Sequence, residues 1–489
     1  MNSILLGYDI GVMSGAGIYI KKDLKLSNIQ LEILMGILNV YSLLGSAAAG
    51  RTSDWIGRRY TIVTAAVIFF LGALFMGFAP NYAILMVGRF VAGIGVGYAL
   101  VIAPVYTAEI SPASSRGFLT SLPEVFINIG TLLGYISNFA FSKMSLNVGW
   151  RLMLGLGAIP AVLIGLGVLV MPESPRWLVM QGRIAEARRT LHLVSDSPDE
   201  ANLRLDEIKK AVGISLDCND DHITVAKNSN GKGVWRELFL HPTPAVQHML
   251  LVTFGINFFQ QACGLAAVVL YSPKVFEKAG ITSDNHKLLA TIFVGIVKTS
   301  LVFIGAIMLD RFGRRTVFLY SMAGMIVSHA SLGTWLTVIN QSKTKQTWAI
   351  VMAIISVLSF VATFSMGMGP AAWVYCSEIF PVALRAQGVS VGIGVNRVTG
   401  GLVSMTFLSL QQAITIGGAF YLFMGVGIVG WIFFYTLLPE TRDNSLEEIE
   451  RLFGRFFNWR LTVTELAKNE VEIGESTKTE LTEEPNASS

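Results

Sequence analysis

The chain has 489 residues, of which 52% are hydrophobic and only 14% are charged. A soluble domain carries roughly 25% charged residues, so this composition excludes a water-soluble enzyme. The apolar content is close to what twelve membrane-spanning helices of about 21 residues each would need. The sequence therefore predicts a membrane protein that is not an enzyme.

The net charge of +4 comes from loops and tails. Of the 37 basic and 33 acidic residues, 39 lie in the stretches 172–244 and 439–489. This distribution gives no reason to expect a nucleic-acid partner. Cys218, Cys263 and Cys376 lie far apart without a CxxC pair, and the six histidines show no ligand spacing. We expect neither a disulfide framework nor a metal site.

Twelve apolar runs are long enough to cross a bilayer, where a helix satisfies its own backbone hydrogen bonds. The first six are expected near 1–20, 31–50, 60–79, 82–106, 118–141 and 152–171. The second six are expected near 246–271, 288–309, 316–339, 348–374, 388–411 and 416–438. We therefore divide the chain into a six-helix bundle (1–171), a linker with short helices (172–245), a second six-helix bundle (246–438) and a partly disordered tail (439–489).

The basic residues near the membrane also predict an orientation. Arginines and lysines beside the membrane in the linker and the tail, such as Arg176, Arg183 and Arg451, place both termini and the linker in the cytoplasm. No cleavable signal is visible, because Asp9 interrupts the first apolar run. The first membrane helix is expected to target the chain itself.

An internal repeat relates the two bundles, because three motifs of the first half recur in the second. Duplicated six-helix halves are typical of transporters whose halves rock around a site at their interface. The offsets between matched motifs range from 256 to 269 residues. The pairs are DWIGRR (Asp54–Arg59) with DRFGRR (Asp310–Arg315), YTAEISPASSR (Tyr106–Arg116) with YCSEIFPVALR (Tyr375–Arg385), and PES at Pro172 with PET at Pro439.

These motifs resemble those of the sugar-porter branch of the major facilitator superfamily, over about residues 5–450. Within that branch, the segments LLGYDIGVMSGA, PEVFINIGTLLGY and GVNRVTGGLVSMTFLSL look most like plant polyol and monosaccharide proton symporters. The resemblance implies an all-α membrane protein with twelve transmembrane helices in two six-helix pseudo-repeats. It rests on GRTSDWIGRR at Gly50, PESPRWL at Pro172, QQ at Gln260, DRFGRR at Asp310, GPAAW at Gly369 and PETRD at Pro439.

Acids and arginines at the cytoplasmic helix ends are expected to form ion-pair networks. Such networks would latch one half against the other in the outward-facing state, which the family resemblance also implies. The alternative is that the basic residues only mark topology. The network residues are Asp54, Arg58, Arg59, Glu109 and Arg116 in the first half, and Asp310, Arg314, Arg315, Glu378 and Arg385 in the second.

Five ionisable residues lie within the apolar runs: Asp9, Arg89, Glu124, Lys298 and Arg397. A charge at bilayer depth costs on the order of 2.5 to 3.5 kcal/mol unless it is paired or hydrated. By resemblance, Asp9 matches the proton-carrying aspartate of the symporters and Arg89 its arginine partner. Burial and a nearby guanidinium shift the pKa of a carboxyl group in opposite directions. The arrival of cargo can therefore load or release the proton of that group. The alternative is a static structural ion pair.

Substrate selection needs neutral donors and acceptors, because a hydroxyl-rich solute must exchange its hydrogen bonds to water for bonds to protein. By resemblance, the expected lining is Gln260, Gln261, Trp373 and Asn396. A glutamine pair within an apolar run also favours function over packing on its own. Trp373 by itself is equally consistent with a helix interface.

Several positions depart from the general sugar-porter pattern. Glu124 and Lys298 stand where hexose transporters usually have glutamine and asparagine, and Cys263 and Ala266 replace a serine and an asparagine. We hypothesise that Glu124 and Lys298 pair across the cavity and bind polyol hydroxyls by charge-assisted hydrogen bonds. The alternative is that Lys298 extends to the interface or pairs elsewhere.

The sequence thus favours a symporter that imports a polyol or monosaccharide with a proton by alternating access. The proton is the coupling ion and no other cofactor is expected. We expect a monomer in the plasma membrane. The alternatives are a facilitative uniporter, a sugar sensor, or an inactive amino-terminally shortened isoform, since only eight residues precede Asp9.

Overall fold

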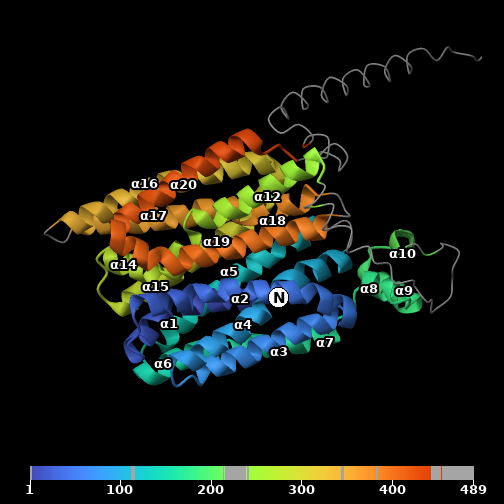
Figure 1. Cartoon of the computed structure of the whole chain (residues 1–489), viewed down its shortest axis with the longest axis horizontal. Coiled ribbons are helices and arrows are strands. Elements are labelled where there is room, and N and C mark those ends of the chain that lie inside the picture. The colour runs from blue at the N-terminus through green and yellow to red at the C-terminus, as the bar shows by residue number, and fades with distance from the viewer. Residues whose placement is uncertain are drawn as a thin grey trace, which may run out of the picture.

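The computed structural model describes residues 3–111, 116–212, 242–342, 346–380 and 384–441, with the single residues 214, 238 and 453. Its helices run lengthwise through one elongated bundle, in which the first half of the chain lies beside the second (Figure 1). Within the described helices, side chains are not described at 116–118, 120, 121, 211, 310, 377, 385 and 386.

Six helical elements cross the bundle in the first half. The sixth is interrupted at Leu156 and Gly157, so that it consists of two shorter helices. The elements are α1 (Ser3–Asp23), α2 (Asn28–Ile56), α3 (Arg58–Gly77), α4 (Tyr82–Ile110), α5 (Arg116–Phe141) and the pair α6 (Leu146–Gly155) and α7 (Ala158–Val170).

The second half repeats this arrangement with more interruptions. Two runs that the sequence predicts as continuous, near 246–271 and 348–374, are broken in the structure. The elements are α12 (Pro244–Ala262), α13 (Leu265–Leu270), α14 (Ser272–Lys278), α15 (Asp284–Phe312), α16 (Arg314–Gln341), α17 (Thr347–Met366), α18 (Met368–Glu378), α19 (Arg385–Ile414) and α20 (Ile416–Leu437).

Eleven helical segments of the described residues are long and apolar enough to cross a membrane. α5, with 26 residues, packs against α1 and α15 and completes the set of twelve. The packing of α1 on α5 is close, because a Cβ atom at Gly11 would lie 2.2 Å from the carbonyl oxygen of Thr131. Small residues therefore let these two backbones approach each other directly.

The break between α12 and α13 has a local cause. Gly264 has φ +82°, a left-handed conformation that glycine adopts at little cost. A Cβ atom there would lie 2.7 Å from the ring of Phe423, so the position also lacks space for a side chain. Gln260 and Gln261 lie immediately before this break.

The linker forms a small domain of its own at one end of the bundle (Figure 1). Trp177, Leu178, Leu191 and Leu205 are among the apolar side chains that it buries. We call this end of the molecule the linker end and the opposite end the far end. The linker helices are α8 (Pro175–Met180), α9 (Ile184–Val194) and α10 (Pro198–Val212).

The two halves contact each other at the far end. The Glu32 carboxylate on α2 accepts hydrogen bonds from the Ser409 backbone N–H at 2.7 Å and from its hydroxyl at 2.6 Å. Lys22 also forms an ion pair with Asp284 at 3.3 Å. Tyr135 on α5 donates to the carbonyl oxygen of Val269 at 3.1 Å. The far end is therefore closed by polar contacts between the halves.

Candidate functional site

A cavity lies between the two halves, lined by residues of both. α1, α2 and α5 contribute its walls from the first half, and α12, α13, α15, α17, α18 and α19 from the second. All six residues that the sequence analysis assigned to substrate binding line this cavity. They are Glu124, Gln260, Gln261, Lys298, Trp373 and Asn396.

Three amide side chains of the cavity form one hydrogen-bonded set. Gln260 donates to the carbonyl oxygens of Met368 at 3.1 Å and Gly369 at 3.3 Å, where α18 begins. Asn396 donates to Oε1 of Gln260 at 2.6 Å, and its own Oδ1 accepts from Gln261 at 3.2 Å. This set fixes the orientation of neutral donors and acceptors without placing a charge among them.

The proposed pairing of Glu124 with Lys298 does not form in this structure. Both residues line the cavity, but no ion pair within 4.0 Å joins them among the described contacts. Glu124 instead accepts a hydrogen bond from Asn128, one turn along α5, at 3.3 Å. Lys298 is buried with 6% of its surface exposed. The two charges therefore line the same cavity without a direct contact among the described ion pairs, and their pairing stays a prediction.

Asp9 and Arg89 form a buried ion pair between α1 and α4. Nη1 of Arg89 lies 2.6 Å from both carboxylate oxygens of Asp9. Arg89 is fully buried and Asp9 is 4% exposed. Among the described contacts, Nε and Nη2 of Arg89 have no partner, so the guanidinium is held by this carboxylate alone.

The ion pair lies directly behind the wall of the cavity. Leu6 and Ile10, on either side of Asp9 in α1, line the cavity. A shift of α1 when cargo binds would therefore move Asp9 against Arg89. The pair itself is not among the residues that line the cavity.

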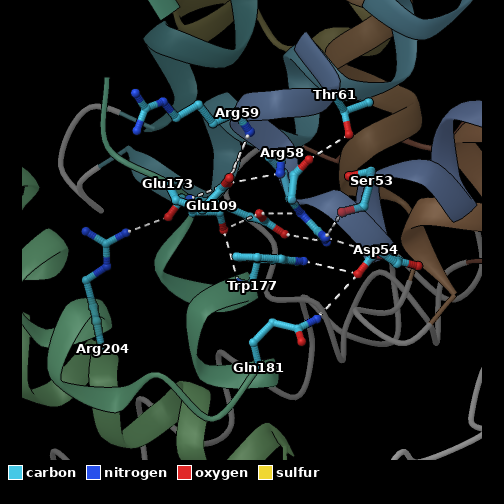
Figure 2. Close-up of polar contacts among 12 residues, drawn as sticks. Ser53, Asp54, Arg58, Arg59, Thr61, Glu109, Glu173, Trp177, Gln181 and Arg204 are labelled. Carbon is cyan, nitrogen blue, oxygen red and sulfur yellow. Dashed lines mark hydrogen bonds and ion pairs between the residues drawn. The ribbon is translucent and has the colours of Figure 1, made fainter. Parts of the chain in front are cut away.

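A network of charged and polar groups lies at the linker end of the first half (Figure 2). Arg58 contacts Glu109 at 3.1 Å and Asp54 at 3.1 Å. Trp177 donates to the Asp54 carbonyl oxygen at 3.1 Å, and Arg204 donates to the Glu109 carbonyl oxygen at 3.2 Å. The network therefore attaches the linker helices to the ends of α2 and α4.

Glu173 caps the start of α3 (Figure 2). Its carboxylate accepts hydrogen bonds from the backbone N–H groups of Arg58 at 2.9 Å and Arg59 at 3.1 Å. An acidic group at a helix amino terminus satisfies free N–H groups and interacts favourably with the helix dipole. A Cβ atom at Gly57, with φ +93°, would lie 2.4 Å from this carboxylate, so the turn needs glycine.

The second half repeats this cap at the start of α16. Glu440 accepts from the backbone N–H of Arg314 at 2.8 Å and of Arg315 at 3.0 Å. Arg314 pairs with Glu378 at 2.9 Å, as Arg58 does with Glu109. Gly313 has φ +81° and lies against Glu440, as Gly57 lies against Glu173.

Three other predicted network residues, Arg116, Asp310 and Arg385, have side chains outside the described part of the structure. The contacts given above join groups within one half or between a half and its flanking segment. A latch between the halves at the linker end remains a prediction for the outward-facing state.

Four further residues of the site had no role in the sequence analysis. Asn39 lines the cavity and accepts a hydrogen bond from Arg397 at 3.2 Å. Arg397 also lines the cavity, and the sequence marked it only as a charge within an apolar run. Glu32 joins the halves at the far end. In the sequence, Glu173 and Glu440 were visible only as parts of the PES and PET motifs. The repetition of these motifs was the signal that both residues occupy equivalent structural positions.

The twelve helical elements, the cavity at the interface of two repeats and the duplicated end networks define a secondary transporter with the major facilitator fold. Residues 1–453 match the family model described as sugar (and other) transporter. The chain therefore belongs to this family, and both the all-α fold and the resemblance to sugar porters are confirmed. It is an integral membrane protein that crosses the bilayer several times.

Individual proteins resemble the chain along most of its length. Polyol transporter 5 of Arabidopsis thaliana is 62% identical over 461 residues, which cover 94% of this chain and 85% of that protein. The structure of the proton:xylose symporter XylE bound to 6-bromo-6-deoxy-D-glucose has a TM-score of 0.76 at 28% identity, covering 92% of this chain and 97% of XylE. A partially occluded inward-open structure of XylE from E. coli has a TM-score of 0.75 at 26% identity, covering 91% and 97%.

Proposed function

We propose that the chain is a proton-coupled symporter that imports polyols and monosaccharides by alternating access. One observation carries this proposal. A cavity with an ordered set of neutral amides lies between the halves, and a buried Asp9–Arg89 pair lies directly behind its α1 wall. The first feature suits a neutral, hydroxylated cargo, and the second suits a proton.

The names of similar proteins support the same activity. The relative with 62% identity is a polyol transporter, and the structural neighbour with 28% identity is a proton:xylose symporter. Both similarities extend over more than nine-tenths of this chain. They therefore extend over both bundles rather than one alone.

Cargo recognition is assigned to Gln260, Gln261 and Asn396, with Trp373 as an apolar surface for the carbon chain. A hydroxyl group both donates and accepts, and an amide offers both functions within one side chain. A cargo hydroxyl can therefore replace water on these groups without leaving a buried polar atom unpaired. A solute without hydroxyls would not make this exchange.

Proton coupling is assigned to Asp9 and Arg89. A proton on Asp9 removes the charge that holds the Arg89 guanidinium and so weakens the contact between α1 and α4. Cargo in the cavity would contact α1 through Leu6 and Ile10, which line it on the same helix as Asp9. Protonation and cargo binding would therefore favour the same movement of α1, which is the requirement for coupled transport.

The linker end is assigned to the cytoplasm, from the distribution of basic residues. With this orientation, the far-end contacts close the external side, and cargo leaves toward the linker end. We assign the protein to the plasma membrane. There, one proton that moves down a potential of 100 mV contributes about 2.3 kcal/mol. The proton is the coupling ion, no other cofactor takes part, and one chain forms the complete pathway.

Current and pH measurements in oocytes that express the full chain test this proposal. D-glucitol or D-xylose, added at acidic external pH, is expected to produce an inward current and to alkalinise the medium. Uptake that only equilibrates the solute, without current and without dependence on the proton gradient, would identify a uniporter and overturn proton coupling.

A further inference from the structure

Three ionisable side chains line the central cavity among its described residues: Glu124, Lys298 and Arg397. Their formal charges leave one positive charge in excess. The neighbouring Asp9–Arg89 pair adds no net charge, because its two members cancel. The cavity is therefore more cationic than a neutral cargo requires.

The two cations are buried, and Glu124 lies within electrostatic range of both but forms no direct ion pair with either among the described contacts. Arg397 is 7% exposed, and its described hydrogen bond goes to the neutral amide of Asn39 at 3.2 Å. Its Nε atom is buried without a partner among the described contacts. Lys298 is 6% exposed and has no ion pair among the described residues. Glu124 is bonded to Asn128 and neutralises neither cation by direct contact.

A buried cation without a counterion is costly, so buried charges in proteins are usually paired. A hydroxyl oxygen of a polyol can accept a hydrogen bond from either cation, but it leaves the charge in place. A carboxylate accepts hydrogen bonds and also cancels the charge, and the planar guanidinium of arginine matches its two oxygens. The cavity thus offers amides for hydroxyl groups and cations for an acidic group.

We propose that the cavity also binds polyhydroxylated carboxylates, the aldonate counterparts of linear polyols. Their carboxylate is assigned to Arg397, with Lys298 supplying the second positive charge, and their hydroxyl groups to Gln260 and Asn396. This inference rests on the proposed function, because it uses the same cavity. It extends the cargo from neutral solutes to anionic ones.

D-glucitol and D-gluconate form a matched pair of probes. Both have six carbons and adjacent hydroxyl groups, and they differ at one terminus, which is a hydroxymethyl group or a carboxylate. Uptake of labelled D-glucitol is measured in liposomes that contain the purified full chain, with unlabelled D-glucitol or D-gluconate as competitor. We expect D-gluconate to compete at a concentration equal to or lower than that of D-glucitol.

Charge variants give the inference its sharpest test. Arg397→Gln and Lys298→Gln are each expected to weaken D-gluconate competition about tenfold relative to D-glucitol, as for the loss of one charge-assisted hydrogen bond. Glu124→Gln removes the negative charge and should strengthen D-gluconate competition relative to D-glucitol. Arg397→Lys keeps the charge and should retain most of the preference. The ratio of the competing concentrations of D-gluconate and D-glucitol does not depend on how much of each variant is folded.

Two results would overturn the inference. One is a failure of D-gluconate to compete at a hundredfold excess over D-glucitol. The other is an equal effect of Arg397→Gln on both competitors, which would assign Arg397 a structural role only. If the wild-type chain takes up no D-glucitol, the proposed function fails instead. The inference is then judged by the change in Trp373 fluorescence on addition of D-gluconate, with Trp373→Phe as the control.

Discussion

The linker-end networks of the two halves are close copies, whereas the cavity takes different groups from each half. Glu173 and Glu440 cap equivalent helices at 2.8 to 3.1 Å, and Arg58 and Arg314 pair with equivalent acids. In contrast, the buried ion pair belongs to the first half and the amide set to the second. This difference indicates that the repeat preserves the parts that shape and move the bundles. Under the proposed function, proton chemistry is assigned to the first half and cargo chemistry to the second.

The largest effect is expected in the amide set of the second half. Gln260→Ala leaves the Asn396 amide without its acceptor and two α18 carbonyl oxygens without their donor, at a cost of about 1 to 3 kcal/mol for each unpaired buried group. We expect the ratio kcat/KM for D-glucitol uptake to fall about a hundredfold. Gln261→Ala is the matched control, because its one described hydrogen bond predicts a loss of about tenfold. Equal losses for both variants would contradict an ordered set centred on Gln260.

A smaller effect is expected at the far end, where both halves contribute to one contact. Glu32→Gln replaces a buried carboxylate that accepts two hydrogen bonds from Ser409, and charge-assisted bonds contribute about 1.5 to 3 kcal/mol. The population with an open far end should rise about tenfold. Distances between spin labels at Asn147 and His286 measure this population. Ser409→Ala removes only the hydroxyl donor and should shift it less, while unchanged distances in Glu32→Gln would exclude a role in closure.

The smallest effects are expected at the repeated helix caps, and they should be similar in both halves. Glu173→Gln and Glu440→Gln each weaken a carboxylate cap at a helix amino terminus, at a cost of about 1 kcal/mol of stability. Thermal unfolding of the purified variants measures this loss. A loss confined to one half would show that the caps are equivalent in geometry but not in energy, and the comparison of the halves would then need revision.

Much of the fold was predictable because a bilayer permits few backbone arrangements. The apolar runs predicted the helices that cross the bundle, since an unpaired backbone group in lipid is costly. The breaks at Gly264 and Gly367 were not predictable, because both lie inside apolar runs that are long enough to form one continuous helix. They depend on tertiary neighbours such as Phe423.

The cavity residues were partly predictable because amides and charges within apolar runs need a reason to be there. The partners of these residues were not predictable. Glu124 and Lys298 line one cavity, yet the described side-chain hydrogen bond of Glu124 comes from Asn128 on its own helix. Glu32 and Asn39 lie on α2, where the sequence does not indicate which helix of the other half will contact them.

The central claim is that Asp9 carries the coupled proton, and Asp9→Asn tests it most directly. Liposomes with the variant are compared with wild type for D-glucitol accumulation against a gradient and for exchange of D-glucitol at equal concentrations on both sides. We predict that accumulation is lost and exchange continues, because the substituted side chain still fills the α1–α4 contact but cannot cycle a proton. Accumulation at the wild-type level in Asp9→Asn would contradict the mechanism.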